Sequence, residues 1–158
     1  MDLNTLASLG EFVAGLGVIV SLVYLSLQVR QNTLSVRAST NQAFAEAAGE
    51  IGGSLYADPE LFKFFEKAMR SPGSLDRSER LRWHLIATRI VRHMESSYYQ
   101  YLFGTMDSEL WAGLDASFRG MASEPGLALW IQRNESRIAA PVRLWFVEMG
   151  VIDEASAV

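Results

Sequence analysis

The chain has 158 residues, of which 49% are hydrophobic and 20% are charged, and this length suits one domain around a single hydrophobic core. Its formal net charge of −4 disfavours general nucleic-acid binding, which needs a basic surface, so we expect no nucleic-acid partner. Cysteine is absent, which excludes disulfide bonds, thiolate chemistry and cysteine-ligated metals.

The first element of the chain is an uncharged stretch at residues 12–29, with the sequence FVAGLGVIVSLVYLSLQV. As an α-helix it measures about 27 Å, because each residue adds about 1.5 Å, and this length is close to the hydrocarbon thickness of a bilayer. Eleven of its eighteen residues are Phe, Val, Leu or Ile, whose insertion into lipid is favourable. We therefore predict a transmembrane anchor helix over residues 1–32, surrounded by the lipid bilayer.

Two other interpretations of this stretch stay open. A cleaved signal peptide typically has a basic start and an Ala-x-Ala-like cleavage site, whereas this chain starts with Met-Asp and continues past the stretch with Arg30 and Gln31. The central helix of a soluble bundle needs apolar partners on every side, and a chain of 158 residues makes only a small core.

The charges beside the stretch predict its orientation. No Lys or Arg precedes it, Asp2 and Glu11 lie on that side, and Arg30 and Arg37 follow it. Because positive residues are enriched on the cytoplasmic side, we expect the N-terminus outside and the following domain in the cytoplasm.

The rest of the chain carries helix signals at regular intervals. No proline occurs before Pro59, so the first helix is expected to continue to about residue 55. Later helices begin at an N-cap residue or a proline, at Asp58, Asp76 or Ser78, Asp107, Pro125 and Pro141. Gly104 and Gly150 are expected to end two of them, since glycine accepts the left-handed conformation that closes a helix.

These signals predict the fold class and the domains. No strand alternation of useful length is present, so we predict an all-α protein. In it a single N-terminal transmembrane helix continues into a small cytoplasmic helical bundle at residues 33–150, followed by a flexible acidic tail at residues 151–158.

A family resemblance is carried by residues in two regions. The first is the segment SLVYL at residues 21–25, which runs into QVRQNT at residues 28–33. The second consists of Glu95, the run YYQY at residues 98–101, Gly104 and Leu110-Trp111. These segments resemble a family of uncharacterised bacterial proteins that have one N-terminal membrane helix and a small helical domain. The resemblance implies this architecture, with the span in a bacterial inner membrane, and supplies no activity.

The long helix predicted to end near residue 103 carries the residues that come closest to a chemical site, which are Glu95, Arg92, Tyr98 and Tyr99. They offer an acid, a cation and hydrogen-bond donors, as a ligand-binding or catalytic site would. The competing interpretation is a buried carboxylate held within a structural polar network, and the third is simple exposure. His84 and His93 are nine residues apart and point to opposite faces, so we assign no metal, no cofactor and no catalytic residue.

The first helix also carries a continuous stripe of small and polar residues. Alternate steps of four and three residues from Gly10 lead through Ala14, Gly17, Ser21 and Tyr24 to Gln28. The predicted helix–helix contact is formed by Gly10, Ala14, Gly17, Ser21 and Gln28 of this stripe. Small residues let two helices approach closely in lipid, and Gln28 can form a hydrogen bond across the contact. We predict a homo-oligomer or docking on another membrane protein through this stripe. The alternative is that the stripe faces lipid and water.

A cluster of positive charge follows in the long helix. Five arginines fall within sixteen residues in which Glu79 is the only acid: Arg77, Arg80, Arg82, Arg89 and Arg92. A surface of anionic lipid would attract such a cluster. The alternative is a solvated helix face with weak ion pairs.

Taken together, these patterns predict a single-pass membrane-anchored interaction or accessory subunit that acts as a scaffold. The alternative is a membrane-tethered enzyme or ligand sensor that uses a polar site around Glu95, Tyr98 and Tyr99. A deep polar pocket around Glu95 would favour the enzyme or sensor, whereas a packed aromatic core there would favour the scaffold.

Overall fold

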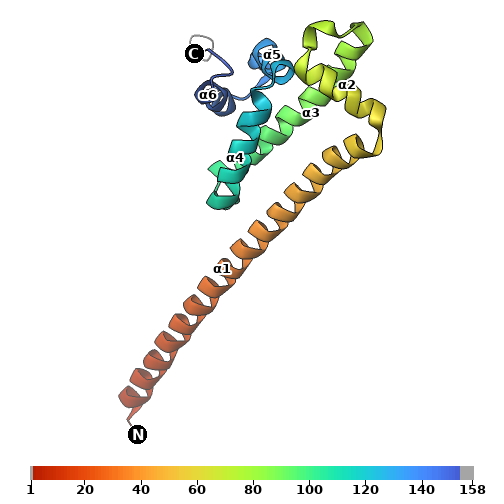
Figure 1. The fold of residues 1–158 in the computed structure, drawn as a ribbon. Coiled ribbons are helices and arrows are strands. Elements are labelled where there is room, and N and C mark those ends of the chain that lie inside the picture. Colours follow the sequence, from red (N-terminus) through yellow and green to blue (C-terminus); the bar gives the residue numbers. More distant parts are fainter. Residues whose placement is uncertain (1, 154–158) are drawn as a thin grey trace. The chain divides into compact units, whose positions relative to one another are not determined.

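The structure is a computed structural model of the chain, and it describes residues 2–153. For helix residues 3–9, 44, 47, 48, 50, 51, 54 and 56 it describes the backbone and not the side chain. The described residues form six α-helices and two short 3-10 helices, and none of them lies in a strand (Figure 1). The prediction of an all-α protein is therefore confirmed.

The chain divides into two compact units, Met1–Ser39 and Thr40–Val158. Helix α1, Leu3–Ala57, begins in the first unit and ends in the second. It is continuous through the stretch that lacks proline, as the sequence predicts, and the expected boundary after residue 32 lies inside this helix.

The first unit is formed by the apolar part of α1. The segment Gly10–Ala43 is long enough and apolar enough to cross a membrane. The same length and composition also fit a signal sequence or the core helix of a soluble protein. The hydroxyl of Ser21 donates a hydrogen bond to the carbonyl of Gly17 at 2.8 Å, and Thr33 donates to Val29 at 2.9 Å. These hydroxyls are therefore satisfied inside the helix itself.

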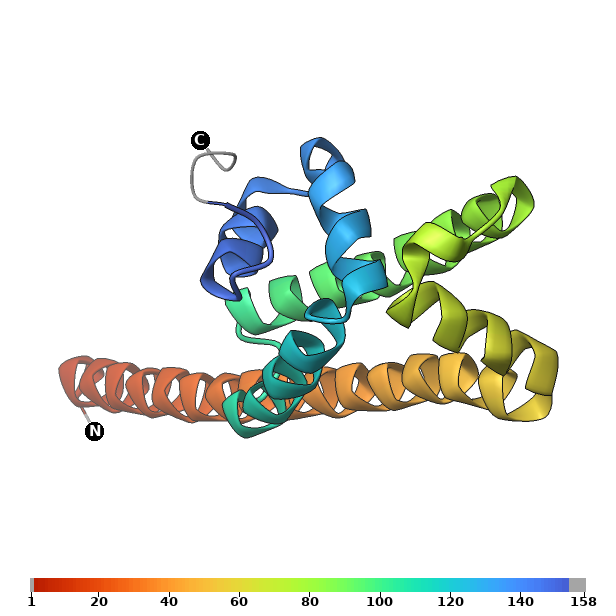
Figure 2. The same cartoon turned by 45° about the horizontal axis from the view of Figure 1, so that its top comes forward.

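The second unit adds five helices: α2 Pro59–Arg70, α3 Arg77–Leu102, α4 Ser108–Ala122, α5 Pro125–Arg133 and α6 Ala140–Glu148. The 3-10 helices η1 Pro72–Ser74 and η2 Glu135–Arg137 precede α3 and α6. The short helix α5 packs against α2, α3 and α4 (Figure 2). The predicted helix starts are confirmed, with α6 beginning at Ala140, one residue before the expected proline.

Local chemistry explains where α2 begins and where α3 and α6 end. The Asp58 carboxylate accepts hydrogen bonds from the first backbone N–H groups of α2, and Pro59 occupies the position where an N–H is not needed. Gly104 has φ of 70° and Gly150 has φ of 74°, the left-handed conformation that ends a helix. Both predicted glycine stops are therefore confirmed.

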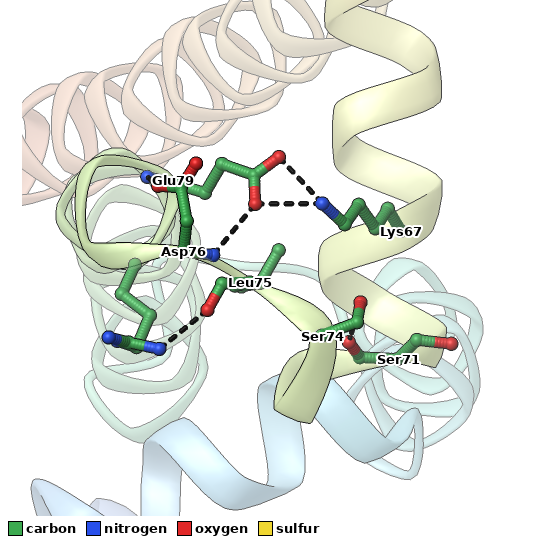
Figure 3. A network of polar contacts seen from close by, with 7 residues as sticks. Lys67, Ser71, Ser74, Leu75, Asp76 and Glu79 are labelled. Carbon is green, nitrogen blue, oxygen red and sulfur yellow. Dashed lines mark hydrogen bonds and ion pairs between the residues drawn. The ribbon is translucent and has the colours of Figure 1, made fainter.

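Asp76, and not Ser78, caps the start of α3. The Asp76 carboxylate accepts a hydrogen bond from the Glu79 N–H at 2.8 Å, and the Glu79 carboxylate accepts one from the Asp76 N–H at 2.8 Å (Figure 3). Lys67 of α2 donates to both oxygens of Glu79 at 2.7 Å. The hydrogen bond from Lys67, followed by that from Asp76, lowers the pKa of the Glu79 carboxyl.

One hydrophobic core joins the helices of the second unit. Its fully buried large side chains include Met94, Leu127, Ile131, Val142 and Phe146. Gly126 of α5 is buried where a Cβ would lie only 2.0 Å from the carbonyl oxygen of Ala68 in α2. Glycine is required here because any side chain would force the two helices apart.

The end of the chain is packed further than expected. Val151 and Ile152 are 5% and 4% exposed and belong to the core, although the predicted tail starts at residue 151. The N–H of Val151 donates to the carbonyl of Phe146 at 3.0 Å, because Gly150 turns the chain back over α6. Residues 154–158 of the predicted tail lie outside the described residues.

Candidate functional site

Glu95 lies in α3 with its side chain turned inward, so that 7% of that side chain is exposed. One carboxylate oxygen accepts a hydrogen bond from the Arg92 guanidinium, one turn earlier. The other oxygen accepts from the backbone N–H of Ala139 at 3.2 Å. Ala139 is the residue that precedes α6, so Glu95 satisfies an N–H group at the start of that helix.

Arg92 extends this link toward the same segment. Its guanidinium also donates to the carbonyl oxygen of Arg137 at 3.3 Å, and 59% of its side chain remains exposed. Both oxygens of Glu95 are engaged by protein donors. A general acid or base needs an oxygen that faces substrate, so this geometry is that of a structural link between α3 and the start of α6.

Tyr98 lies in a layer of aromatic rings. Its ring stacks on Trp145 of α6, with centroids 4.9 Å apart and planes at 2°, and lies 5.6 Å from the ring of Trp111 in α4. Burial, followed by the negative charge of Glu148, raises the pKa of the Tyr98 hydroxyl. Tyr98 is therefore neutral at physiological pH and does not act as a base there.

Tyr99 lies elsewhere, stacked on Phe103 with ring centroids 5.8 Å apart. Among the hydrogen bonds that the described residues make, none joins Tyr98 or Tyr99 to Glu95. The structure thus brings Glu95 and Arg92 together and places the two tyrosines in separate aromatic contacts. What surrounds this part of α3 is a packed aromatic layer.

A second polar link crosses the aromatic layer, and it was not predicted from the sequence. The indole N–H of Trp145 in α6 donates to Asp115 of α4 at 2.8 Å. Arg119 donates to the other oxygen of Asp115 at 2.7 Å. This half-buried carboxylate is satisfied on both oxygens and fixes α6 against α4.

Two small clefts between α3 and α5 were also not predicted. Their volumes are about 170 and 140 Å³, and they share His84 and Trp130 as a wall. The Trp130 N–H donates to Nδ1 of His84 at 3.0 Å, so Nδ1 is the acceptor in this contact. Arg80 and Arg133 line the larger cleft, and Arg92 and Arg137 line the smaller one. No acidic side chain among the described residues lines either cleft. The positive charge of this lining is complementary to that of a small anion.

The two histidines have different surroundings. His84 contacts Trp130 of α5, whereas the His93 ring lies 6.1 Å from the ring of Phe118 in α4. Burial, followed by the positive charge of Arg89, lowers the pKa of His93. Among the described residues, no group of three or more His, Asp or Glu side chains is arranged to hold a metal ion.

The predicted helix–helix contact lies in the first unit. All five of its residues are exposed on α1: Gly10, Ala14, Gly17, Ser21 and Gln28. A Cβ added at Gly10 or Gly17 would meet no atom within 4 Å, so the stripe is open to close approach. The Gln28 amide donates to the Tyr24 hydroxyl at 3.2 Å, one turn earlier on the same stripe.

Comparison with known proteins does not assign the chain to a family. No protein-family model matches the chain, and no curated protein and no solved structure is similar enough to count as a match. The resemblance to a family of bacterial membrane-anchored proteins therefore stays a prediction, and the function is argued from the chain's own residues.

Proposed function

We propose that this chain is a single-pass membrane-anchored accessory subunit, in which α1 crosses the bilayer and the second unit is an interaction module. The observation that carries the proposal is the surface of α1. Every side chain from residue 10 to residue 39 is exposed, including all eleven large apolar residues of the stretch. The core helix of a soluble protein would be mostly buried, so exposure on all sides favours lipid as the environment.

The polar residues of the stretch support the same proposal. A hydroxyl or amide in hydrocarbon is costly unless it has a hydrogen-bond partner. Ser21 and Gln28 find partners one turn earlier in α1, at 2.8 and 3.2 Å. These two side chains therefore each have a hydrogen-bond partner within the helix when they enter the bilayer. The orientation that we propose is N-terminus outside and second unit in the cytoplasm of a bacterium, from the arginines that follow the stretch.

Alkaline carbonate extraction and protease protection test the anchor and its orientation. We expect the protein to stay in the membrane pellet after a carbonate wash, and a protease added to spheroplasts to spare the second unit. Release into the carbonate supernatant would remove the span. Digestion of the second unit from outside would reverse the orientation while leaving the span intact.

The accessory role rests on the stripe of small residues in α1, through which we propose a homo-oligomer or docking on another membrane protein. Apolar burial does not drive pairing in lipid, so close backbone approach at Gly10, Ala14 and Gly17 supplies the contact. Changing Ala14, Gly17 and Ser21 together to Leu should reduce the particle size in mild detergent or release a co-purifying subunit.

A matched control for that variant lies on the opposite side of the same helix. Changing Gly15, Val23 and Ser26 together to Leu adds similar bulk away from the stripe, because these positions are about half a helical turn round from it. We expect this control to keep the parent's particle size. Equal sizes for the stripe variant, the control and the parent would remove the stripe from the proposal.

The alternative of an enzyme or ligand sensor at Glu95 is less well supported. Both Glu95 oxygens hold protein donors, and Tyr98 is packed among tryptophans. The scaffold role is favoured because Tyr98 is packed in an aromatic layer and Glu95 lines neither of the two clefts described above.

A further inference from the structure

The side of α3 that faces away from the core has an unusual composition. We define the outer face of α3 as the exposed residues Ser78, Leu81, Arg82, Leu85, Arg89, Arg92 and Ser96. They recur at steps of one, three and four, which places them on one side of a helix. The buried residues Trp83, Ala87, Ile90 and Met94 define the opposite side.

Two leucines lie at the centre of this face. Leu81 and Leu85 are one turn apart, and each is 64% exposed. On this face Arg82 lies between the two leucines and Arg89 follows Leu85 by one turn, whereas Leu144 of α6, which is 56% exposed, has one adjacent arginine, Arg143. Adjacent leucines in water are unfavourable, and their position beside long cationic side chains on one helix face is the pattern of a helix that lies at a lipid interface.

The charge of the outer face is opposite in sign to that of the chain. It holds three arginines and no acid, whereas the whole chain carries a net charge of −4. Arg92 is compensated by its pair with Glu95, while Arg82 lies over the Phe64 ring at 4.9 Å, a contact that leaves its charge uncancelled. Glu79, the one acid within residues 77–92, accepts hydrogen bonds from Lys67 and from the Asp76 N–H (Figure 3).

We propose that the outer face of α3 docks on an anionic lipid surface, with Leu81 and Leu85 entering the headgroup region and Arg82 and Arg89 meeting lipid phosphates. The inference rests on the proposed function, because an anchored chain keeps its second unit at a high effective concentration near the bilayer. Negative headgroups attract the arginines, and the acidic remainder of the chain is repelled, so this face is the one turned to the lipid.

The absence of cysteine allows a clean test in the full chain. Three single-cysteine variants each receive a polarity-sensitive fluorophore: Leu85→Cys on the outer face, Leu144→Cys on α6 as a matched exposed leucine, and Val20→Cys in the apolar stretch. Each is reconstituted into vesicles of phosphatidylcholine, with or without phosphatidylglycerol. We expect the Leu85 label to shift to the blue only with phosphatidylglycerol, and the Leu144 label not to shift. Salt should reverse the shift, because about 1 M salt shortens the screening length from about 10 Å to about 3 Å.

Charge variants in the Leu85→Cys background separate lipid from protein as the occupant. The double change Arg82→Gln and Arg89→Gln should abolish the blue shift, whereas the same loss of charge at Arg70 and Arg133, which lie off the outer face, should preserve it. A shift that persists without anionic lipid or in detergent would mean that a second copy covers the face, and would overturn the proposal. The proposal would also be overturned if the Leu85 label does not shift while the Val20 variant's label reports a hydrocarbon environment. A Val20 label in water would instead overturn the anchor and this inference together.

Discussion

Adding one methyl group at Gly126 should destabilise the second unit more than any other change of that size. The Cβ of Gly126→Ala would lie 2.0 Å from the Ala68 carbonyl oxygen and 2.8 Å from the Met69 Cα. Non-bonded carbon atoms pack at about 3.5–4.0 Å, so α5 has to withdraw from α2 by more than about 1 Å. The obstacle is backbone, which cannot rotate away as a side chain would.

The magnitude follows from what that withdrawal disturbs. Overpacking a core costs about 1–3 kcal/mol, and the upper end applies because Leu127 and Ala68 beside the contact are fully buried. The better helix propensity of alanine offsets up to about 1 kcal/mol of this cost. We therefore expect a net loss of about 2 kcal/mol in the free energy of unfolding.

Urea unfolding followed by tryptophan fluorescence measures this loss, because all four tryptophans lie in the second unit. The control is Gly113→Ala in α4, where an added Cβ meets no atom within 4 Å. This control should gain about 0.4–1 kcal/mol from the restricted unfolded state. A Gly126→Ala midpoint equal to the parent's or above it would refute the close approach of α2 and α5.

Three further changes test the polar groups of the second unit. Glu95→Ala should lose about 1–3 kcal/mol of stability because the Ala139 N–H is left without a partner, and Glu95→Gln should lose less; a Gln variant that melts like the parent but loses a defined ligand would favour the sensor alternative. The pKa of His93 is lowered in the folded chain, so as the pH falls below about 6.5 the unfolded chain takes up a proton first and the free energy of unfolding should fall. In His93→Gln the free energy of unfolding measured with urea should depend less on pH over that window. The pKa of Glu79 is also lowered in the folded chain, so its contribution to stability is present above the unfolded pKa of about 4.3 and is lost as the pH falls through the folded pKa. In Glu79→Gln the free energy of unfolding measured with urea should therefore depend less on pH in this acidic range.

The parts of the fold that could be predicted are those that local chemistry decides. Asp58 with Pro59, and Asp76 with Glu79, carry their helix starts within three or four neighbouring residues. Gly104 likewise marks the end of α3 by its own conformation. Such signals need no knowledge of what packs where, so the sequence alone is enough for them.

The contacts that escaped prediction join residues far apart in the chain. Glu95 meets Ala139 and His84 meets Trp130 across 44 and 46 residues, and nothing near either residue indicates the partner. The end of the bundle escaped for a related reason. An acidic, small-residue end favours a loose tail, yet Val151 and Ile152 are captured by the core once Gly150 turns the chain.

The start of α6 explains why Glu95 is buried. The N-cap residue of α6 is Ala139, which has no side-chain oxygen to offer, and Pro141 follows near the helix start. A helix start carries unpaired N–H groups and a partial positive charge, both of which a carboxylate satisfies. Glu95 supplies from α3 an acceptor for the N–H of this N-cap residue, as an acid in the first turn of α6 would in a capping box, and Asp115 then holds the middle of the same helix through Trp145. The buried Glu95 is thus explained by an N–H group forty-four residues away, at the start of a helix whose first turn has no acidic side chain to accept from it.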